Sequence, residues 1–408
     1  MAEGDEWHGL EQPVQDPEEL RVMNSAVDSF QQYARVAHYQ VTHMRRQTFY
    51  ALPRAQWEML AAPPFNYLDT LTKVDEAIDS NAELARAIFQ CGLDAFGLGV
   101  PDEVTGELKL PKQWNGFSKH HDIDKARSTL RQFYRDWTAE GASERAACYG
   151  PVMKAIASEK KNLQPGKRLN VLVPGAGLGR LVFELLLAGC DVQGNEISYH
   201  QLLASSFILN RCERAEQFTI YPWVHTFSNH HSRENQLRGY KVPDVHCATE
   251  TMRAGELGEM SMTAADFLCE YTKPDNASTF DVVATVFFLD TAPNLVRYLE
   301  CIYSCLKPGG ILVNIGPLLW HFEGQVPGSK QVDDDEGDTV AEMSGIAEPG
   351  SFELTDDEVM QLVTKCGFVV ESREQNLEAP YIHDAQSMLQ TKYLASTWVA
   401  RKPATAAS

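Results

Sequence analysis

Apolar runs of strand length alternate with helix-like stretches through the second half of the chain. Residues 171–173 are all apolar. Glycine-rich residues 174–179 follow, and a helical pattern begins after them. Strands that are apolar on both sides are typical of a parallel sheet covered by helices on both faces. The pattern therefore predicts an α/β fold with a doubly covered, mostly parallel sheet. The expected strands lie at 171–173, at 190–194, just before Asp266, at 280–290 and within 306–316.

The first part of the chain is helical instead. Apolar and aromatic side chains recur every three or four residues in 25–52 and from Leu68 to Leu98, and a further helix is expected from about Asp122 to Ala139. The acidic, polar start predicts disorder. The expected organisation is a disordered acidic tail (1–20), a helical region (21–165), an α/β core (166–325), an acidic loop insertion (326–351) and a C-terminal helix with a terminal strand pair (352–408).

A glycine-rich turn follows the first expected strand. Gly175, Gly177 and Gly179 occupy alternate positions and lead into a helix. Glycine lets a ligand lie against bare backbone, and the helix offers unpaired N–H groups at its positive end. Such a turn binds the ribose and tail of a nucleotide-like cofactor. The dinucleotide fingerprint would need another glycine where Arg180 stands, and many turns of this kind need glycine for packing alone.

Acidic residues recur at the carboxyl ends of the expected strands. Glu196 lies about 20 positions past the first glycines, where folds of this type bind ribose hydroxyls, although an acid is also favoured at a helix start. Asp266 and Phe267 could grip the edge and face of an adenine. Asp290 ends the run 280–290. Because ligands bind at the carboxyl ends of parallel strands, these residues predict one site.

Composition narrows the function classes. The 408 residues include 56 acidic and 36 basic side chains, a net charge of −20 that argues against a nucleic-acid ligand. The sequence shows neither a membrane-length apolar run nor a signal peptide, so we expect no membrane partner. Nine cysteines without metal-type spacing indicate reduced thiols and a cytoplasmic or nuclear protein. These features favour a soluble enzyme with a small or cationic substrate.

A histidine-containing segment, YPWVHTFSNHH, could suggest a metal site. His225, His230 and His231 are close in sequence, but no cysteine or carboxylate completes a zinc spacing. We therefore predict that the protein binds no metal. Tyr221 and Trp223 of the same segment are candidates for pocket walls.

The order of these parts resembles a class I S-adenosylmethionine-dependent methyltransferase, a Rossmann-like fold. Segments 365–375 and 394–403 look like the terminal strand pair that these enzymes add, which implies a seven-stranded sheet with an antiparallel terminal strand. Over 20–403 the chain is similar to the carnosine N-methyltransferase family, which methylates an imidazole nitrogen of β-alanyl-histidine to give anserine. The resemblance is carried by RQFYRDW, ERAACYGPV, VPGAGLGRL, QGNEIS, FILNRC, YPWVHTFSN, FFLDTA and LKPGGILVNIGPLLWHF.

The resemblance implies S-adenosylmethionine as methyl donor and a helical lid that covers it. It places Gln132 and Arg135, three apart on one helix, against the cofactor. A planar guanidinium suits a carboxylate, although an exposed pair with Asp136 or Asp124 is the alternative. The resemblance also implies that the main chain of Val286 contacts the cofactor. The expected cofactor set is Gln132, Arg135, Gly175, Gly177, Glu196, Asp266, Phe267 and Val286.

An imidazole is largely neutral at pH 7, so it is already a nucleophile. The site therefore needs mainly to orient the imidazole of the substrate. A carboxylate that accepts the distal N–H would fix the tautomer and stabilise the cation formed, and Asp290 is the candidate catalytic and substrate-binding residue. The resemblance implies that His321 and Tyr393 also touch the substrate.

Other functions stay open at this stage. A protein histidine methyltransferase would use the same nucleophile, and the glycine turn could serve an NAD-dependent dehydrogenase or a cofactor-binding scaffold without catalysis. The expected partner is a small dipeptide, with protein histidine substrates and a homodimer as further possibilities.

Overall fold

The structure is a computed structural model that describes residues 16–102, 105–324 and 350–404. It divides into two compact units. The helical unit contains the described residues up to Ala142, with Tyr199–Glu250 and Ile382–Thr391, and the sheet unit contains Ser143–Ser198, Thr251–Tyr381 and the chain from Lys392 onward. The units do not follow the expected boundaries, because 143–165 packs with the sheet unit and 199–250 with the helical unit.

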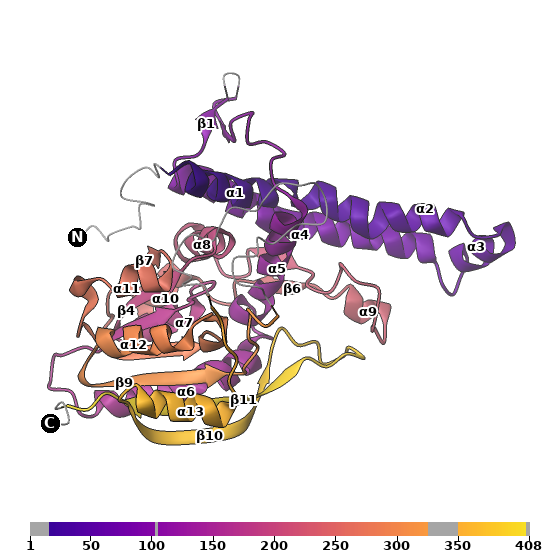
Figure 1. Ribbon diagram of the computed structural model, residues 1–408. Coiled ribbons are helices and arrows are strands. Elements are labelled where there is room, and N and C mark those ends of the chain that lie inside the picture. Colours follow the sequence, from indigo (N-terminus) through magenta and orange to yellow (C-terminus); the bar gives the residue numbers. More distant parts are fainter. Residues whose placement is uncertain (1–15, 103–104, 325–349, 405–408) are drawn as a thin grey trace. The chain divides into compact units, whose positions relative to one another are not determined.

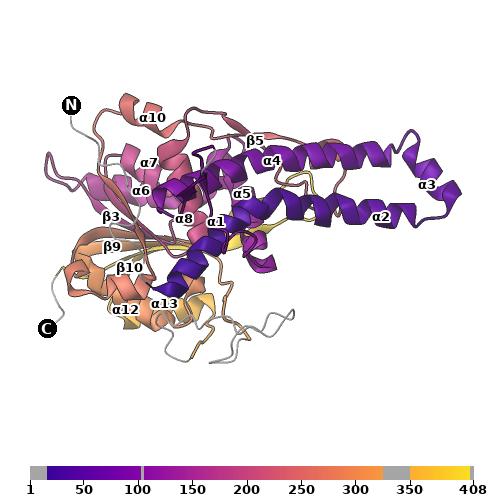
Figure 2. The same cartoon turned by 90° about the horizontal axis from the view of Figure 1, so that it is seen from above.

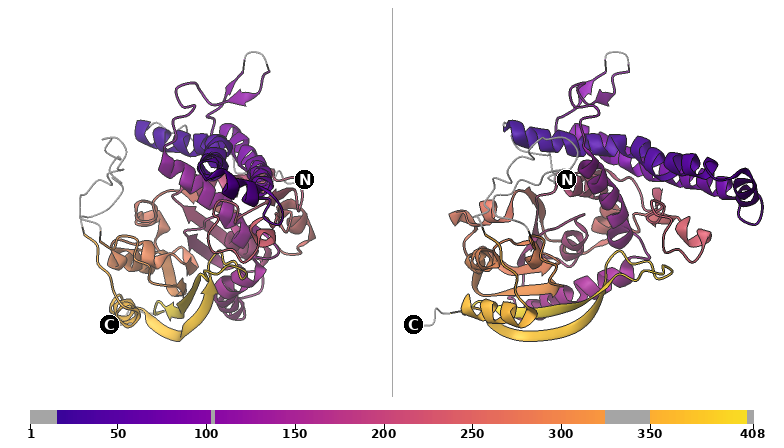
Figure 3. Two further views of the ribbon diagram at one scale, coloured as in Figure 1. Left: turned by 90° about the vertical axis from the view of Figure 1, so that its right-hand side faces the viewer. Right: turned by 45° about the vertical axis from the view of Figure 1, so that its right-hand side comes forward.

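The sheet unit is built on seven strands in the order β10-β11-β9-β8-β3-β4-β7. Figure 1 shows β9, β10 and β11 of this sheet with α12 and α13 beside them. All neighbouring strands are parallel except at β11, which runs antiparallel to both β9 and β10. This confirms the predicted sheet and its terminal strand pair, whose long strands run side by side in Figure 3. The strands are β3 (Asn170–Pro174), β4 (Asp191–Glu196), β7 (Met260–Ala264), β8 (Phe280–Val286), β9 (Leu306–Gly316), β10 (Val369–Pro380) and β11 (Lys392–Arg401).

Both faces of this sheet are covered by helices. Along β8, Val282 and Ala284 pack with side chains of α6 and α7, whereas Val283 packs with side chains of α11, α12 and α13. Burial on both faces explains why the central strands β3 and β8 are mostly apolar. The helices are α6 (Ala142–Lys160), α7 (Arg180–Leu187), α11 (Phe267–Tyr271), α12 (Leu295–Cys305) and α13 (Asp356–Lys365), with the short turns η3 (Pro274–Asn276) and η4 (Leu289–Thr291).

The connections reverse direction at the middle of the sheet. From β3 the chain continues to β4 and β7 on one side, then returns to β8 and β9 on the other. Strands β3 and β8 pair only at Val171–Val282 and Leu172–Val283, although both continue beyond these residues. In open α/β sheets, ligands bind outside the carboxyl ends of the strands at such a reversal. The glycine turn and the segment that holds Asp290 follow these two strands.

The helical unit contains two long helical arms. Helices α1 and α2, joined by the π-helical turn η1, run beside α4, and α3 lies at the far end of the arms (Figure 2). These arms confirm the helices expected at 25–52 and from Leu68 to Leu98. Their bounds are α1 (Pro17–Ala37), η1 (His38–His43), α2 (Met44–Tyr50), α3 (Arg54–Ala61) and α4 (Tyr67–Ala95).

The rest of the helical unit consists of shorter elements. Helix α5 confirms the expected helix at about 122–139, and the two-stranded sheets β1–β2 and β5–β6 are additions to the expected fold. The elements are β1 (Val100–Pro101), β2 (Leu108–Lys109), α5 (His120–Trp137), α8 (Tyr199–Ser206), η2 (Phe207–Arg211), β5 (Phe218–Ile220), α9 (Arg233–Gln236), β6 (Tyr240–Val242) and α10 (Cys247–Arg253).

Two expectations concern residues at the margins of the structure. Helix α1 begins at Pro17 with Asp16 as its N-cap, so 17–20 are helical and do not belong to a disordered tail. An N-terminal cap and a proline in the first turn stabilise a helix start. The remainder of the expected tail lies outside the described residues. The acidic insertion at 326–351 also lies outside them, apart from its last two residues.

Within the described residues, every helix is too short or too polar to cross a membrane.

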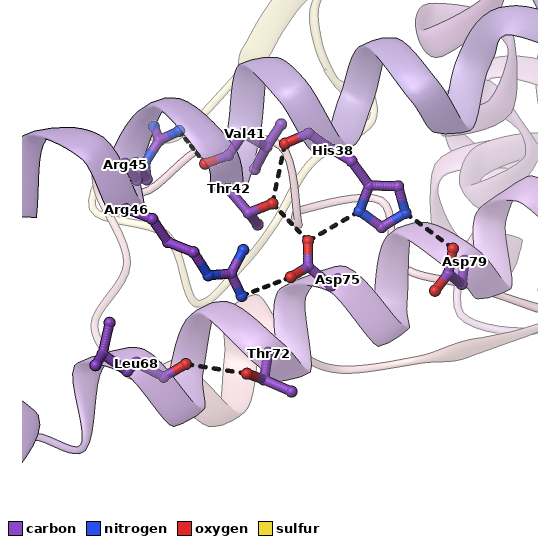
Figure 4. Close-up of polar contacts among 9 residues, drawn as sticks. All are labelled: His38, Val41, Thr42, Arg45, Arg46, Leu68, Thr72, Asp75 and Asp79. Carbon is purple, nitrogen blue, oxygen red and sulfur yellow. Dashed lines mark hydrogen bonds and ion pairs between the residues drawn. The ribbon is translucent and has the colours of Figure 1, made fainter.

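A polar cluster joins η1 to α4 (Figure 4). His38 contacts two carboxylates, Asp75 at 2.8 Å through Nδ1 and Asp79 at 2.9 Å through Nε2. Asp75 also accepts from the Thr42 hydroxyl and from Arg46. A neutral imidazole donates from only one nitrogen, so this arrangement requires the imidazolium. Burial opposes the charge, but the bonds to Asp75 and Asp79 outweigh it and raise the pKa of His38.

The stability that His38 contributes should therefore depend on pH. A histidine whose pKa is raised on folding stabilises the fold fully below about pH 6.5, and this contribution is lost as the pH rises through the folded pKa. In urea unfolding, the advantage of the wild type over His38→Gln should shrink by about 0.5–1 kcal/mol between pH 6 and pH 9, because the site is partly exposed. His43→Gln, an exposed histidine of the same turn, is the control. An advantage that is equal at both pH values would contradict this.

Candidate active site

The glycine turn between β3 and α7 adopts a backbone that other residues avoid. Gly175, Gly177 and Gly179 have φ of 68°, 59° and 75°, in the left-handed region. A Cβ added at Gly175 would lie 2.8 Å from the ring of Phe288. Gly179 is the N-cap of α7, whose first N–H groups have no partner within the helix. In this turn Gly175 is exposed, whereas Gly177 and Gly179 are buried. The expected contact of the turn with a ligand stays a prediction.

Glu196 lies at the end of β4 and is hydrogen-bonded to this turn. Its Oε2 accepts the N–H of Gly177 at 2.9 Å, and its Oε1 accepts the N–H groups of Ile197 and Ser198 at 2.9 Å each. Burial raises the pKa of Glu196, while these three bonds favour the ionised form. A carboxylate accepts about four hydrogen bonds, so acceptor capacity remains for a hydroxyl. The structure thus brings together Glu196 and the glycine turn.

Asp266 and Phe267 lie at the start of α11. The Asp266 carboxylate caps the helix by accepting two of its backbone N–H groups, and burial raises the pKa of Asp266. The Phe267 ring is only 3% exposed and packs against Phe288 and Tyr298, with ring centroids 5.4 and 5.2 Å away. The expected contact of this ring with an adenine face stays a prediction. In this structure the ring is part of the apolar core.

The end of β8 carries residues that the sequence did not single out. Val286 is followed by Phe287, which has a positive φ of 54° and donates its N–H to the Ile315 carbonyl. The Phe287 ring lies 5.3 Å from that of Tyr381 and 5.8 Å from that of Tyr393. A left-handed non-glycine residue is uncommon and is often found at functional sites. The only sequence signal was a pair of phenylalanines at the end of an apolar strand.

Asp290 lies in η4, directly after β8. Its side chain accepts the Leu319 N–H at 2.9 Å, and its backbone carbonyl accepts the His321 N–H at 3.2 Å. Burial raises the pKa of Asp290, opposed by the Leu319 N–H and by the nearby His321. Asp290 is 4% exposed, whereas His321 is exposed. The structure thus brings these two predicted substrate residues together.

Gln132 and Arg135 lie on α5 in the helical unit, and both bind Asp136. Arg135 makes two hydrogen bonds to this carboxylate, at 2.6 and 3.0 Å, and Gln132 donates to it at 3.2 Å. Asp136 is 1% exposed. The alternative of an exposed Arg–Asp pair named the correct partner, Asp136, but this carboxylate is buried and Arg135 is only partly exposed. A two-point contact fixes the plane of the guanidinium.

The histidine-containing segment 221–231 also belongs to the helical unit. Trp223 is buried against Tyr134 of α5, and His225 is hydrogen-bonded to Tyr33 of α1 at 2.7 Å. Among the residues that the structure describes, no three histidine, cysteine or acidic side chains gather where they could hold a metal ion.

Comparisons with known proteins identify the family. A family model described as carnosine N-methyltransferase matches residues 112–404. Carnosine N-methyltransferase of Rattus norvegicus is 34% identical over 380 residues, which cover 92% of this chain and 85% of that protein. The enzyme of the same name from Schizosaccharomyces pombe is 34% identical over 392 residues, with 95% and 97% covered. The chain belongs to the carnosine N-methyltransferase family.

Membership of the carnosine N-methyltransferase family confirms the resemblance and, with the strand order, the Rossmann-like class I methyltransferase fold. The matched range includes every predicted site residue from Gln132 to Tyr393. Because the chain belongs to a methyltransferase family, the glycine turn no longer indicates an NAD-dependent dehydrogenase. A solved S-adenosylmethionine-dependent methyltransferase from Methanosarcina mazei is 17% identical with a TM-score of 0.36, covering 61% of this chain and 98% of that chain, a likeness too weak to argue from.

The Asp136 carboxylate on α5 yields a prediction about stability. Asp136→Asn removes the buried charge that accepts hydrogen bonds from Arg135 and Gln132, and losing such charge-assisted bonds costs about 1.5–3 kcal/mol. Asp124→Asn on the same helix removes an exposed partner of Arg127 and should cost less than about 1 kcal/mol. The free energy of unfolding in urea measures both. Equal losses in the two variants would contradict a structural role of the Asp136 pair.

Proposed function

We propose that this protein transfers a methyl group from S-adenosylmethionine to an imidazole nitrogen of carnosine, giving anserine. The observation that carries the proposal is the 34% identity to carnosine N-methyltransferases along nearly the whole length of both chains. The bond between Glu196 and Gly177 at the glycine turn, and the buried Asp290 after β8, support it. Both lie at the carboxyl ends of central strands, where this fold binds its ligands.

The residues at the glycine turn fit S-adenosylmethionine. Glu196 would accept a ribose hydroxyl, while the bare backbone at Gly175–Gly179 would lie against the cofactor. On α5, Gln132 and Arg135 are the family-implied candidates for the carboxylate tail, because a planar guanidinium matches the geometry of a carboxylate. When bound, the cofactor supplies an electrophilic methyl group on its sulfonium.

Asp290 is the proposed catalytic residue. In its ionised form it would accept the N–H of the substrate imidazole, fix the tautomer and leave the other nitrogen's lone pair available for the methyl group. Roughly three quarters of an unperturbed imidazole is neutral at pH 7, so little proton removal is needed beforehand. As the ring becomes a cation, the buried carboxylate stabilises the charge more strongly than an exposed one would. His321 and Tyr393 would bind the polar ends of the dipeptide.

Access to Asp290 requires movement in the sheet unit. The residue is 4% exposed, and its carboxylate accepts the N–H of Leu319 in the segment after β9. We expect this segment to shift when substrate binds, which would also exclude water from the reacting atoms.

The proposed substrate is a small molecule, and a histidine in a protein would offer the same nucleophile.

A homodimer is also proposed. It is supported by α3, which buries none of its residues and has the exposed apolar side chains Met59 and Phe65 in or beside it. A cytoplasmic or nuclear location remains a prediction.

The proposal is tested by incubating the purified protein with methyl-labelled S-adenosylmethionine. A panel of histidine dipeptides and denatured proteins is offered as substrate. We expect label in carnosine ahead of the other dipeptides and of the proteins. Calorimetry should show binding of S-adenosylmethionine and none of NAD. Label that enters only proteins would replace the dipeptide by a protein substrate, and a protein that transfers no label would contradict the proposed activity.

Asp290→Asn tests the catalytic residue. An amide keeps the size of the side chain but loses the charge, so we expect kcat with carnosine to fall by about 100-fold or more. The affinity for S-adenosylmethionine should change by less than about twofold, since the defect lies in the chemical step. Asp275→Asn, in the exposed turn η3, is the matched control and should keep full activity. An unchanged kcat in Asp290→Asn would remove this residue from the mechanism.

A further inference from the structure

A largely buried chain of hydrogen bonds joins three segments of the helical unit. It consists of Tyr33 on α1, Asn81 on α4 and His225 in the segment after β5, and we call it the Tyr33–Asn81–His225 network. Tyr33 is fully buried and Asn81 is 2% exposed. The Tyr33 oxygen lies 2.7 Å from His225 Nε2 and 3.2 Å from Asn81 Nδ2. None of these residues belongs to the proposed catalytic or cofactor set.

The direction of each bond in this network can be assigned. Asn81 Oδ1 accepts the backbone N–H of Tyr221 at 2.7 Å, so the amide nitrogen is the donor on its other side. That nitrogen donates to the Tyr221 carbonyl at 3.1 Å and to the Tyr33 oxygen. The Tyr33 hydroxyl must then donate to His225, because otherwise its hydrogen would have no acceptor. His225 therefore accepts through Nε2 and carries its proton on Nδ1.

The surroundings keep His225 in this neutral form. Burial lowers the pKa of His225 to about 3, and the positive charges of Arg127 and Arg131 act in the same direction. Both arginines belong to α5. A neutral acceptor is thus the form of this side chain that suits both the Tyr33 hydroxyl and the cationic side chains of α5.

The network holds the segment Tyr221–His225 at both ends. Asn81 binds the backbone of Tyr221 through two hydrogen bonds, and Tyr33 binds the side chain of His225. Trp223, between them, is 5% exposed. Its ring contacts Tyr134 of α5 edge-to-face, with centroids 5.0 Å apart, and the Arg131 guanidinium lies 5.2 Å from its centroid. The fixed segment therefore supports the helix that carries Gln132 and Arg135.

We propose that Tyr33, Asn81 and His225 are positioning residues for the cofactor-binding helix α5. By fixing Tyr221–His225 they hold Trp223 against Tyr134, the immediate neighbour of Arg135. Directional hydrogen bonds suit this purpose better than apolar packing, because packing alone permits small shifts and an unmade buried hydrogen bond is costly. The inference rests on the proposed function, in which Gln132 and Arg135 bind the tail of S-adenosylmethionine.

Tyr33→Phe is the first test, because it removes one hydroxyl and keeps the ring. We expect the dissociation constant for S-adenosylmethionine, measured by calorimetry, to rise about fivefold to tenfold, since small misplacements of binding groups are costly. With saturating cofactor, kcat should stay within about twofold of the wild type. Tyr39→Phe is the matched control, because Tyr39 follows on the same helical arm but is 57% exposed. Its dissociation constant should not change.

Substitutions at His225 test the bond from the other side. His225→Leu removes the acceptor and should weaken cofactor binding as much as Tyr33→Phe, whereas His225→Gln keeps an acceptor oxygen and should restore most of the affinity. Because both changes break the same bond, the double variant Tyr33→Phe with His225→Leu should bind no more weakly than His225→Leu alone. All measurements are made well below each variant's unfolding midpoint.

The outcomes separate this inference from the function on which it rests. A wild-type protein that binds no S-adenosylmethionine would overturn the proposed function and the positioning role with it. A wild type that binds, with Tyr33→Phe and His225→Leu melting earlier but binding equally well, would leave the proposed function intact and overturn the positioning role alone. A loss of kcat without a change in cofactor affinity would also overturn it.

Discussion

The carboxylate of Glu196 and the backbone of the glycine turn constrain each other. Three glycines of the turn after β3 have a positive φ, and glycine has few conformational preferences of its own to hold such a shape. A buried acceptor at the end of the neighbouring strand binds Gly177 directly and the start of its own loop through Ile197 and Ser198. One side chain thus fixes two loops at the strand ends. A ligand that needs both loops meets a surface that is already organised, which lowers the entropy lost on binding.

Two further carboxylates follow the same principle. Asp266 and Asp290 are, like Glu196, held by backbone N–H groups at the carboxyl ends of strands, and burial raises the pKa of all three. Removing a carboxylate from water is unfavourable, and backbone donors compensate for it only in part. A fold that required only stability would be better served by apolar side chains at these positions. Perturbed carboxylates gathered along one edge of a sheet are therefore consistent with a site that binds polar ligands.

The sequence was most informative where periodicity and burial coincide. β8 could be predicted because both of its faces are buried, so most of its residues are apolar, and α4 because its apolar stripe repeats over many turns. Strands β5 and β6 have three residues each, too few for alternation to be recognised. Periodicity also does not show with which unit a segment packs, and 199–250 was therefore misplaced. Among the site residues, spacing predicted that Glu196 meets the glycines, but not that the Phe267 ring or the Asp136 carboxylate is buried.

The proposed reaction explains why so few of these residues have a chemical role. A neutral imidazole is already a nucleophile and a sulfonium methyl group is already an electrophile, so rate depends mainly on alignment and on the exclusion of water. Selection for alignment acts on groups that hold other groups, and such groups are spread over the whole chain. Asp136 orients Arg135, Glu196 orients the glycine turn, and Asn81 holds the backbone of Tyr221. In a methyltransferase of this kind, we therefore expect hydrogen bonds that hold a binding group in place to influence cofactor affinity without touching the cofactor.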